Sequence, residues 1–178
     1  VTPRQIISQI TRASNEMNLP HPVHIHANNL GLPGNWETTR QTMEALEGHR
    51  GHLTHIQFHS YGGGDGEEES LSSKVASLVE YVNDHPNITV DVGQVLFGET
   101  TSMTGDGPLG YFLHNVYGSK WFSADTELES GCGIAPIKYR NKSLVHSLQW
   151  AIGLEWYLMM DDPWRVVMST DHPNGGSF

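Results

Sequence analysis

Hydrophobic and polar residues follow a helical period in four stretches of the chain. In each stretch apolar side chains recur every three to four residues, as Ile6, Ile7 and Ile10 do in the first. Thr2 followed by Pro3 is typical of a helix start, because threonine caps the first turn and proline fits its first position. The pattern predicts helices at residues 3–19, 37–46, 71–82 and 143–160.

Between the helical stretches lie shorter segments in which apolar and polar residues alternate or apolar residues run together. Such segments are typical of β-strands, and here they fall within residues 22–29, 53–61, 88–98 and 164–170. Helices and strands thus alternate along the chain, which favours an α/β fold with a parallel sheet. Four strands cannot close an eight-stranded barrel. A (β/α)8 protein would therefore hold only about half of its barrel in these residues, roughly strands five to eight.

Histidine and aspartate residues collect at the ends of three predicted strands. Residues alternate faces along a strand, so His24 and His26 point to one side of the first. By the same rule His55 and His59 share a face of the second, and Asp171 directly follows the last. Imidazole and carboxylate groups bind zinc, and three protein ligands leave one position open for chemistry. The sequence therefore predicts a metal site made of His26, His59 and Asp171. His24 and His55 are the alternative ligands if a strand is shifted by one pleat.

Other polar residues have weaker claims to a site. Asp171 itself has a second interpretation, because aspartate often caps a turn, and spacing alone does not choose between the two roles. The remaining histidines are predicted to be structural or to occupy surface, loop or helix positions. They are His21, His49, His52, His85, His114 and His146.

Charge and composition narrow the class of function. The 178 residues carry 20 acidic and 10 basic side chains, a formal net charge of −10. Nucleic acids and anionic membranes bind basic faces, so we expect neither partner. The single cysteine excludes an internal disulfide framework and a cysteine-based zinc cluster. The first residues are amphipathic rather than signal-like, and no run approaches about 18 apolar residues, so the sequence predicts a cytoplasmic location.

Five stretches of the chain are long and unusual enough to be compared with known families. They are HPVHIHANNLGLPGNWETT, THIQFHSYGG, TVDVGQVLFGETTSMTGDGP, LQWAIGLEW and DDPWRVVMSTDHPNGGSF. In this order they resemble the A subunits of formylmethanofuran dehydrogenase and of the formyltransferase/hydrolase complex. The resemblance covers nearly the whole chain.

The resemblance implies a barrel of the metal-dependent amidohydrolase superfamily with a binuclear zinc centre. Residues 1–178 would form the second part of a single barrel domain, with the amino-terminal part and the carboxyl-terminal end missing. His26 would match the ligand of strand five, His59 that of strand six, and Asp171 the catalytic aspartate of strand eight. A His-x-His pair and a carboxylated, metal-bridging lysine are expected before Val1. The chain alone is therefore expected to be inactive.

The resemblance also implies an activity, partners and a substrate pocket. The whole protein would hydrolyse, or in reverse form, the N-formyl bond of a methanofuran or methylofuran carrier. Asp171 would pass a proton to the departing amine, and formate would be released. Asn28, Asn29 and the loop at residues 100–106 would help to form the carrier pocket. Other subunits of the complex are the expected partners.

Three other interpretations stay open at this point. A cyclic-amide hydrolase of the hydantoinase or dihydroorotase type would use the same histidines and aspartate, but it leaves the DVGQVLFGETT and LQWAIGLEW strings unexplained. A structural subunit could keep the barrel and lack the metals. A bare metal-binding module would bind zinc without the rest of the protein. The sequence does not choose between methanogenic and methylotrophic complexes.

Overall fold

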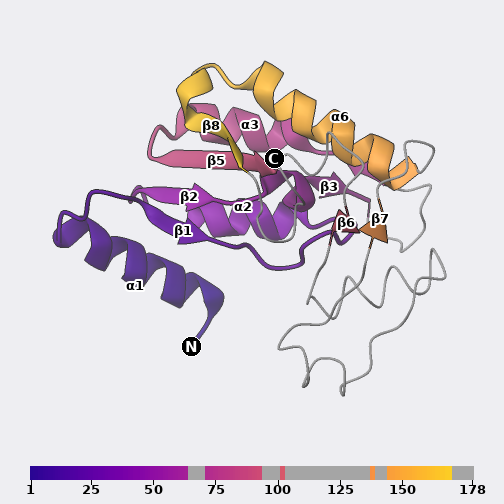
Figure 1. The fold of residues 1–178 in the computed structure, drawn as a ribbon. Coiled ribbons are helices and arrows are strands. Elements are labelled where there is room, and N and C mark those ends of the chain that lie inside the picture. The colour runs from indigo at the N-terminus through magenta and orange to yellow at the C-terminus, as the bar shows by residue number, and fades with distance from the viewer. Residues whose placement is uncertain (64–70, 94–100, 103–136, 139–143, 170–178) are drawn as a thin grey trace.

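A four-stranded parallel sheet forms the centre of the chain. The computed structural model describes residues 1–63, 71–93, 101–102, 137–138 and 144–169. The strands of the sheet are β1 (Val23–Ile25), β2 (Gly51–Leu53), β5 (Ile88–Gly93) and β8 (Val166–Ser169). Their order across the sheet, β1-β2-β5-β8, is also their order along the chain (Figure 1).

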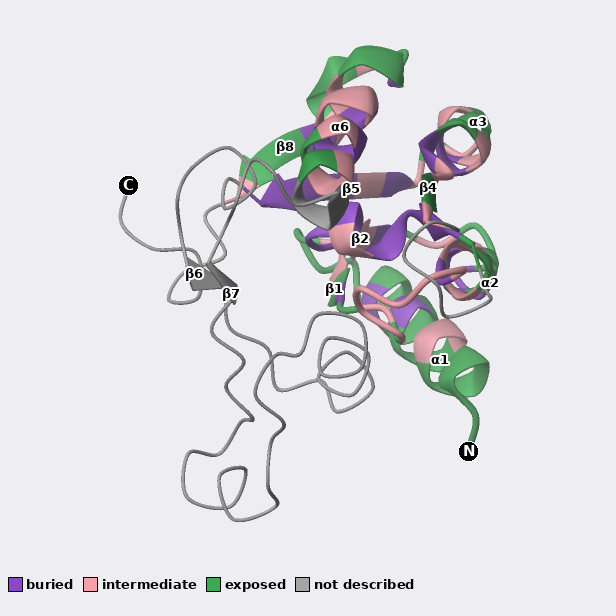
Figure 2. Cartoon of the chain, turned by 90° about the vertical axis from the view of Figure 1, so that its right-hand side faces the viewer, coloured by how far each residue is buried: buried purple, intermediate pink, exposed green. Residues whose placement is uncertain are grey.

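Helices pack against one face of this sheet and bury the core. Figure 2 shows α2 and α3 on the same side of the strands, with buried residues between them. The long helices are α1 (Pro3–Glu16), α2 (Trp36–Glu44), α3 (Val75–Asp84) and α6 (Leu144–Met159). The strands contribute Ile25, Leu53 and Val90, which are level with one another in the parallel register and belong to one buried cluster. Residues between them in sequence therefore point to the opposite face.

The start of α1 is fixed by its own sequence. The Thr2 side chain accepts a hydrogen bond from the backbone N–H of Gln5, and the Gln5 side chain accepts one from the N–H of Thr2. This capping box satisfies two amide donors of the first turn, and Pro3 occupies a position that needs no donor. The helix start predicted at Thr2–Pro3 is confirmed.

Short elements connect the larger ones. β3 pairs antiparallel with β4, and β6 pairs antiparallel with β7. The short elements are η1 (Ile56–His59), β3 (Tyr61–Gly62), β4 (Ser72–Ser73), β6 (Thr101–Ser102), β7 (Ile137–Lys138) and η4 (Pro163–Arg165).

The predicted α/β class and parallel sheet are confirmed, with two local differences. The third predicted helix begins at Val75 instead of at residue 71, because Ser72 and Ser73 pair with Tyr61 and Gly62. The second predicted strand is much shorter than expected, as described below. Consecutive parallel strands fit one half of a (β/α)8 barrel, and closure of that barrel stays a prediction.

Helices of the described residues were also considered as membrane segments. None of them combines the length and the apolar character that a membrane-spanning helix needs.

Candidate metal centre

The carboxyl ends of β1 and β2 lie side by side. Ile25 is level with Leu53, and the N–H of Thr54 donates to the carbonyl oxygen of Ile25 at 3.1 Å. His26 and His55, which come next in the two segments, therefore leave the sheet at neighbouring points.

The chain turns sharply after β2. β2 ends at Leu53, His55 has a left-handed backbone with φ of 37°, and η1 follows at Ile56–His59. The predicted strand over residues 53–61 is therefore wrong, and His55 and His59 share no strand face. In an extended strand His55 would point with Leu53 toward the helix-covered face. The turn at His55 directs its ring to His26 instead.

His26 and His55 make the central contact of the candidate site. Nδ1 of His26 lies 3.0 Å from Nε2 of His55, and the ring centroids are 4.9 Å apart, edge to face. The His26 side chain is exposed, whereas His55 is buried. Two imidazole nitrogens at this separation either share a proton or point their lone pairs at a common electrophile.

His59 lies behind this pair in the protein interior. Its ring stacks on that of His55 with centroids 5.2 Å apart, and the residue is fully buried. Neither of its ring nitrogens has a hydrogen-bond partner among the described residues. Burial, together with the neighbouring His55, lowers the pKa of His59 to about 3, although the backbone of Asn28 opposes the shift. His59 is therefore a neutral imidazole.

His55 has the electrostatic character of a metal ligand. Burial, and then the nearby His26, lower the pKa of His55 to about 4, while Asp91 acts in the opposite direction. Its Nδ1 is buried without a hydrogen-bond partner among the described residues. A divalent metal binds the neutral form of imidazole, so this donor set fits such an ion.

The rings of five histidines form a connected row across β1, β2 and η1. From His52 the row passes to His24 and then to His26, with centroids 5.2 Å apart at each step. It continues through His55 to His59. Two predicted ligands, His26 and His59, thus lie in one cluster with both alternative ligands, and His55 separates them.

His52 and Asp91 belong to this cluster and were not predicted as site residues. His52 lies in β2, so its predicted surface, loop or helix position is wrong. Nε2 of His52 is 2.9 Å from Oδ2 of Asp91, and Nδ1 is 2.8 Å from Oγ1 of Thr89. His24, His52 and Asp91 each present a ligand atom within 4.8 Å of the other two. A signal was present in the sequence, because His52 has the opposite parity to buried Leu53, and Asp91 the opposite parity to buried Val90.

Asp91 is an ionised carboxylate in the sheet. Burial raises its pKa, but hydrogen bonds outweigh that effect and hold the pKa of Asp91 well below its ordinary value. The donors are His52, Ser169, the backbone N–H of His55 and Thr54.

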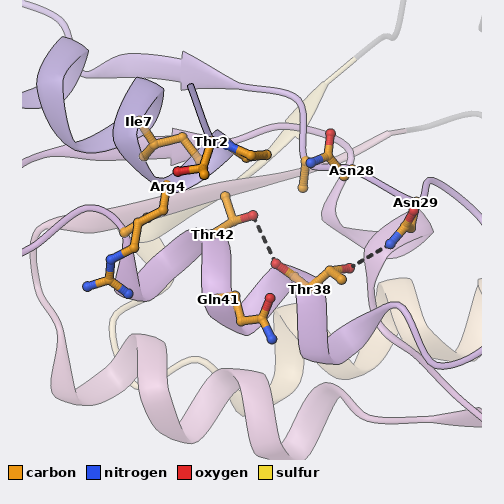
Figure 3. A pocket seen from close by; sticks show the side chains of 11 residues that line it. Thr2, Arg4, Ile7, Asn28, Asn29, Thr38, Gln41 and Thr42 are labelled. Atoms are coloured by element: carbon orange, nitrogen blue, oxygen red, sulfur yellow. Dashed lines mark hydrogen bonds between the residues drawn. The ribbon is translucent and has the colours of Figure 1, made fainter.

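Asn28 and Asn29 line a cavity of about 520 Å³ beside the histidine cluster. Figure 3 shows the cavity between the loop after β1 and the helices α1 and α2. Nδ2 of Asn29 donates to Oγ1 of Thr38 in α2 at 3.4 Å. A second cavity of about 330 Å³ shares Asn28 and is lined also by His24 and His26. Asn28 therefore connects the predicted carrier pocket with the histidines.

Two parts of the predicted site lie outside the described residues. Asp171, the predicted catalytic carboxylate, follows the last described residue, Ser169, by two positions. Within the predicted carrier loop at 100–106, the described part is limited to the backbone of Thr101–Ser102 in β6.

A parallel α/β sheet with histidines at its carboxyl edge defines a class of protein. The chain matches the amidohydrolase family over residues 1–178, and it belongs to that family. The amidohydrolase type predicted from the sequence is confirmed.

Within this class the chain is similar to two curated proteins. It is 44% identical over 189 residues to Protein FwdA of Methanocaldococcus jannaschii, an alignment that covers 100% of this chain and 33% of that protein. It is 42% identical over 185 residues to the A-type component of the formyltransferase/hydrolase complex Fhc of Methylorubrum extorquens, covering 98% of this chain and 32% of that protein. The resemblance to these two proteins, predicted from the five sequence stretches, is confirmed.

A solved structure agrees with these matches. The crystal structure of the formyltransferase/hydrolase complex FhcABCD from Methylorubrum extorquens, in complex with methylofuran, superposes with a TM-score of 0.79 at 42% identity. The match covers 98% of this chain and 32% of that one. The chain thus spans about a third of the length of the relatives it matches.

Proposed function

We propose that the whole protein hydrolyses, or in reverse forms, the N-formyl bond of a methanofuran or methylofuran carrier. Formate and the free amine would be the products of hydrolysis. The convergence of His26 Nδ1 and His55 Nε2 at 3.0 Å, at the carboxyl edge of a parallel sheet in an amidohydrolase, carries this proposal. The names of the relatives support the choice of carrier and of partner subunits.

The residues that would hold zinc are His26 and His55, with Asp171 from the strand end that follows β8. The geometry favours the alternative ligand His55 over His59, because His55 stands between His26 and His59 in the row of rings. When bound, zinc supplies Lewis-acid polarisation of the formyl carbonyl and activation of water. Further ligands for a binuclear centre are expected elsewhere in the whole protein.

The protein groups would divide the remaining work between orientation and proton transfer. Asp171 would take the proton of the attacking water and pass it to the departing amine nitrogen. One water is consumed, the carbon–nitrogen bond of the formamide breaks, and formate and the protonated carrier amine leave. Asn28 and Asn29 would hold the carrier in the cavities beside His26.

The test uses the full-length gene product with the subunits that purify with it. We expect bound zinc in the wild type and release of formate from formylated methanofuran, methylofuran or N-formylfurfurylamine. His26→Ala and His55→Ala should lose metal, whereas Asp171→Asn should keep most of it and lose about 10²–10⁴-fold in rate. His85→Ala is the matched control, since His85 contacts Tyr81 at the end of α3 and lies outside the site.

Other outcomes would select other functions. Metal lost in His59→Ala but kept in His55→Ala would restore His59 as the ligand of the second segment. Turnover of hydantoin or dihydroorotate without turnover of the formylated carriers would indicate a cyclic-amide hydrolase. A wild type with neither metal nor hydrolysis would be a structural subunit.

A further inference from the structure

Asp91 joins three strands of the sheet through one buried carboxylate. The residue is 3% exposed and lies in β5. Its Oδ1 accepts hydrogen bonds from the backbone N–H of His55 at 2.8 Å and from Oγ of Ser169 at 2.5 Å. Its Oδ2 accepts from Nε2 of His52 at 2.9 Å. β2 with the turn that follows it, β5 and β8 therefore meet at this group.

The bond to His55 stabilises an unfavourable backbone conformation. His55 is a non-glycine residue with φ of 37°, and the left-handed region costs such a residue about 1–2 kcal/mol. A hydrogen bond from a backbone amide to an ionised carboxylate is stronger than one to a neutral acceptor. The Asp91 carboxylate thus favours the turn, and the turn is what directs the His55 ring to His26 instead of toward the helix-covered face.

The same oxygen of Asp91 also reaches the end of β8. Ser169 donates to Oδ1 and is the last residue of β8, two positions before Asp171. One carboxylate therefore contacts both chain segments that lead into the proposed zinc ligands of β2 and β8.

We propose that Asp91 is a positioning residue for the metal site. Its carboxylate holds the His55 turn that aims this ring at His26. Through Ser169 it also holds the end of β8. The role rests on the proposed function, because it matters only if His26 and His55 bind a metal. A direct ligand role for Asp91 is less favoured, since both of its oxygens already accept hydrogen bonds.

The test measures Co(II) binding by the full-length gene product after chelation of its native metal. Asp91→Ala removes every acceptor, and Asp91→Asn keeps one acceptor oxygen for the His55 amide. We expect Asp91→Ala to weaken Co(II) binding about 10–100-fold and to shift the visible absorption bands of bound Co(II). Asp91→Asn should restore both to near wild type. Thr89→Val is the control, because Thr89 touches His52 on the same strand.

A thermal melt of each variant separates folding from positioning. A folded Asp91→Ala protein with wild-type affinity and spectrum would overturn the proposal and leave the proposed function intact. If Asp91→Ala does not fold, Asp91→Leu replaces it, and failure of both to fold would overturn the proposal in favour of a purely structural role. An equal loss of binding in His24→Ala would instead make Asp91 a ligand together with His24 and His52. A wild type that binds no Co(II) would refute the proposed metal site and this role with it.

Discussion

His59 is buried beside His55 and has no hydrogen-bond partner for either ring nitrogen among the described residues. Protonation of a ring in this position would bury an uncompensated charge, which is why its pKa falls to about 3. In the unfolded chain the same ring has a pKa of about 6.5. The neutral form therefore stabilises the folded state above pH 6.5, and this contribution is lost as the pH falls from about 6.5 toward 3.

A stability measurement on the metal-free protein checks this sign. Between pH 7.5 and pH 5 the His59 linkage should remove about 2 kcal/mol from the free energy of unfolding. In His59→Leu this part of the acid loss should disappear, and stability at pH 7.5 should not fall by a comparable amount, because leucine fills the space without unpaired nitrogens. Denaturant unfolding at the two pH values gives both numbers.

The control for this experiment is His85→Gln, at the end of α3. It should keep the wild-type acid loss. A His59→Leu protein whose stability falls with pH as steeply as that of the wild type would mean that His59 is hydrogen-bonded or charged in solution.

At the scale of elements, Arg165 fastens η4 to the end of α3. Its Nη1 donates to the carbonyl oxygens of Val82 at 2.8 Å and of His85 and Ile88 at 3.3 Å each. Carbonyls at the last turn of a helix lack partners within the helix, and a cation there also interacts favourably with the helix dipole. The side chain is 12% exposed, so water does not readily replace it.

Arg165→Met should therefore destabilise the protein by about 1–3 kcal/mol without affecting metal content. Methionine keeps the apolar stem and removes the donors, and Arg165→Lys should recover part of the loss. Chemical denaturation and a metal assay on the same samples measure the two effects. Unchanged stability in Arg165→Met would show that the three carbonyls find water instead.

Elements with a local signal could be predicted from the sequence. The start of α1 followed from Thr2 and Pro3, and all four strands of the parallel sheet were placed from their apolar runs. The segment after β2 could not be placed in the same way. Its alternating pattern fits a strand, but Leu53 is buried against helices, so a straight chain would have turned His55 away from His26. What bends the chain is a bond to Asp91, 36 residues later, and no local pattern reports it.

At the scale of the whole molecule, the strand order has consequences for the edges of the sheet. β1 pairs with β2 and β8 pairs with β5, and each presents its other edge without a described partner strand. In a closed barrel both outer edges would be paired, because closure leaves no free edge. The four consecutive parallel strands thus set a clear test of the predicted (β/α)8 fold.

Hydrogen exchange on the full-length gene product provides that test. The backbone amides of β1 and β8 should exchange about as slowly as those of β2 and β5. The exposed loop around Gly48 supplies the fast-exchanging reference within the same protein. Fast exchange confined to β1 and β8 would mean an open sheet and would contradict the barrel.

The contacts of Asp91 also order events during synthesis of the chain. His26 and His55 leave the ribosome first, then Asp91, and Ser169 only 78 residues after Asp91. Contacts between residues so far apart in sequence form late, because a long loop must close before they are made. Until Asp91 is present, nothing in its place holds His55 in the left-handed turn, and until β8 docks, Asp91 lacks the Ser169 donor. A metal ion that meets the nascent chain therefore finds the two imidazoles unaligned, so loading of the site follows translation of β8.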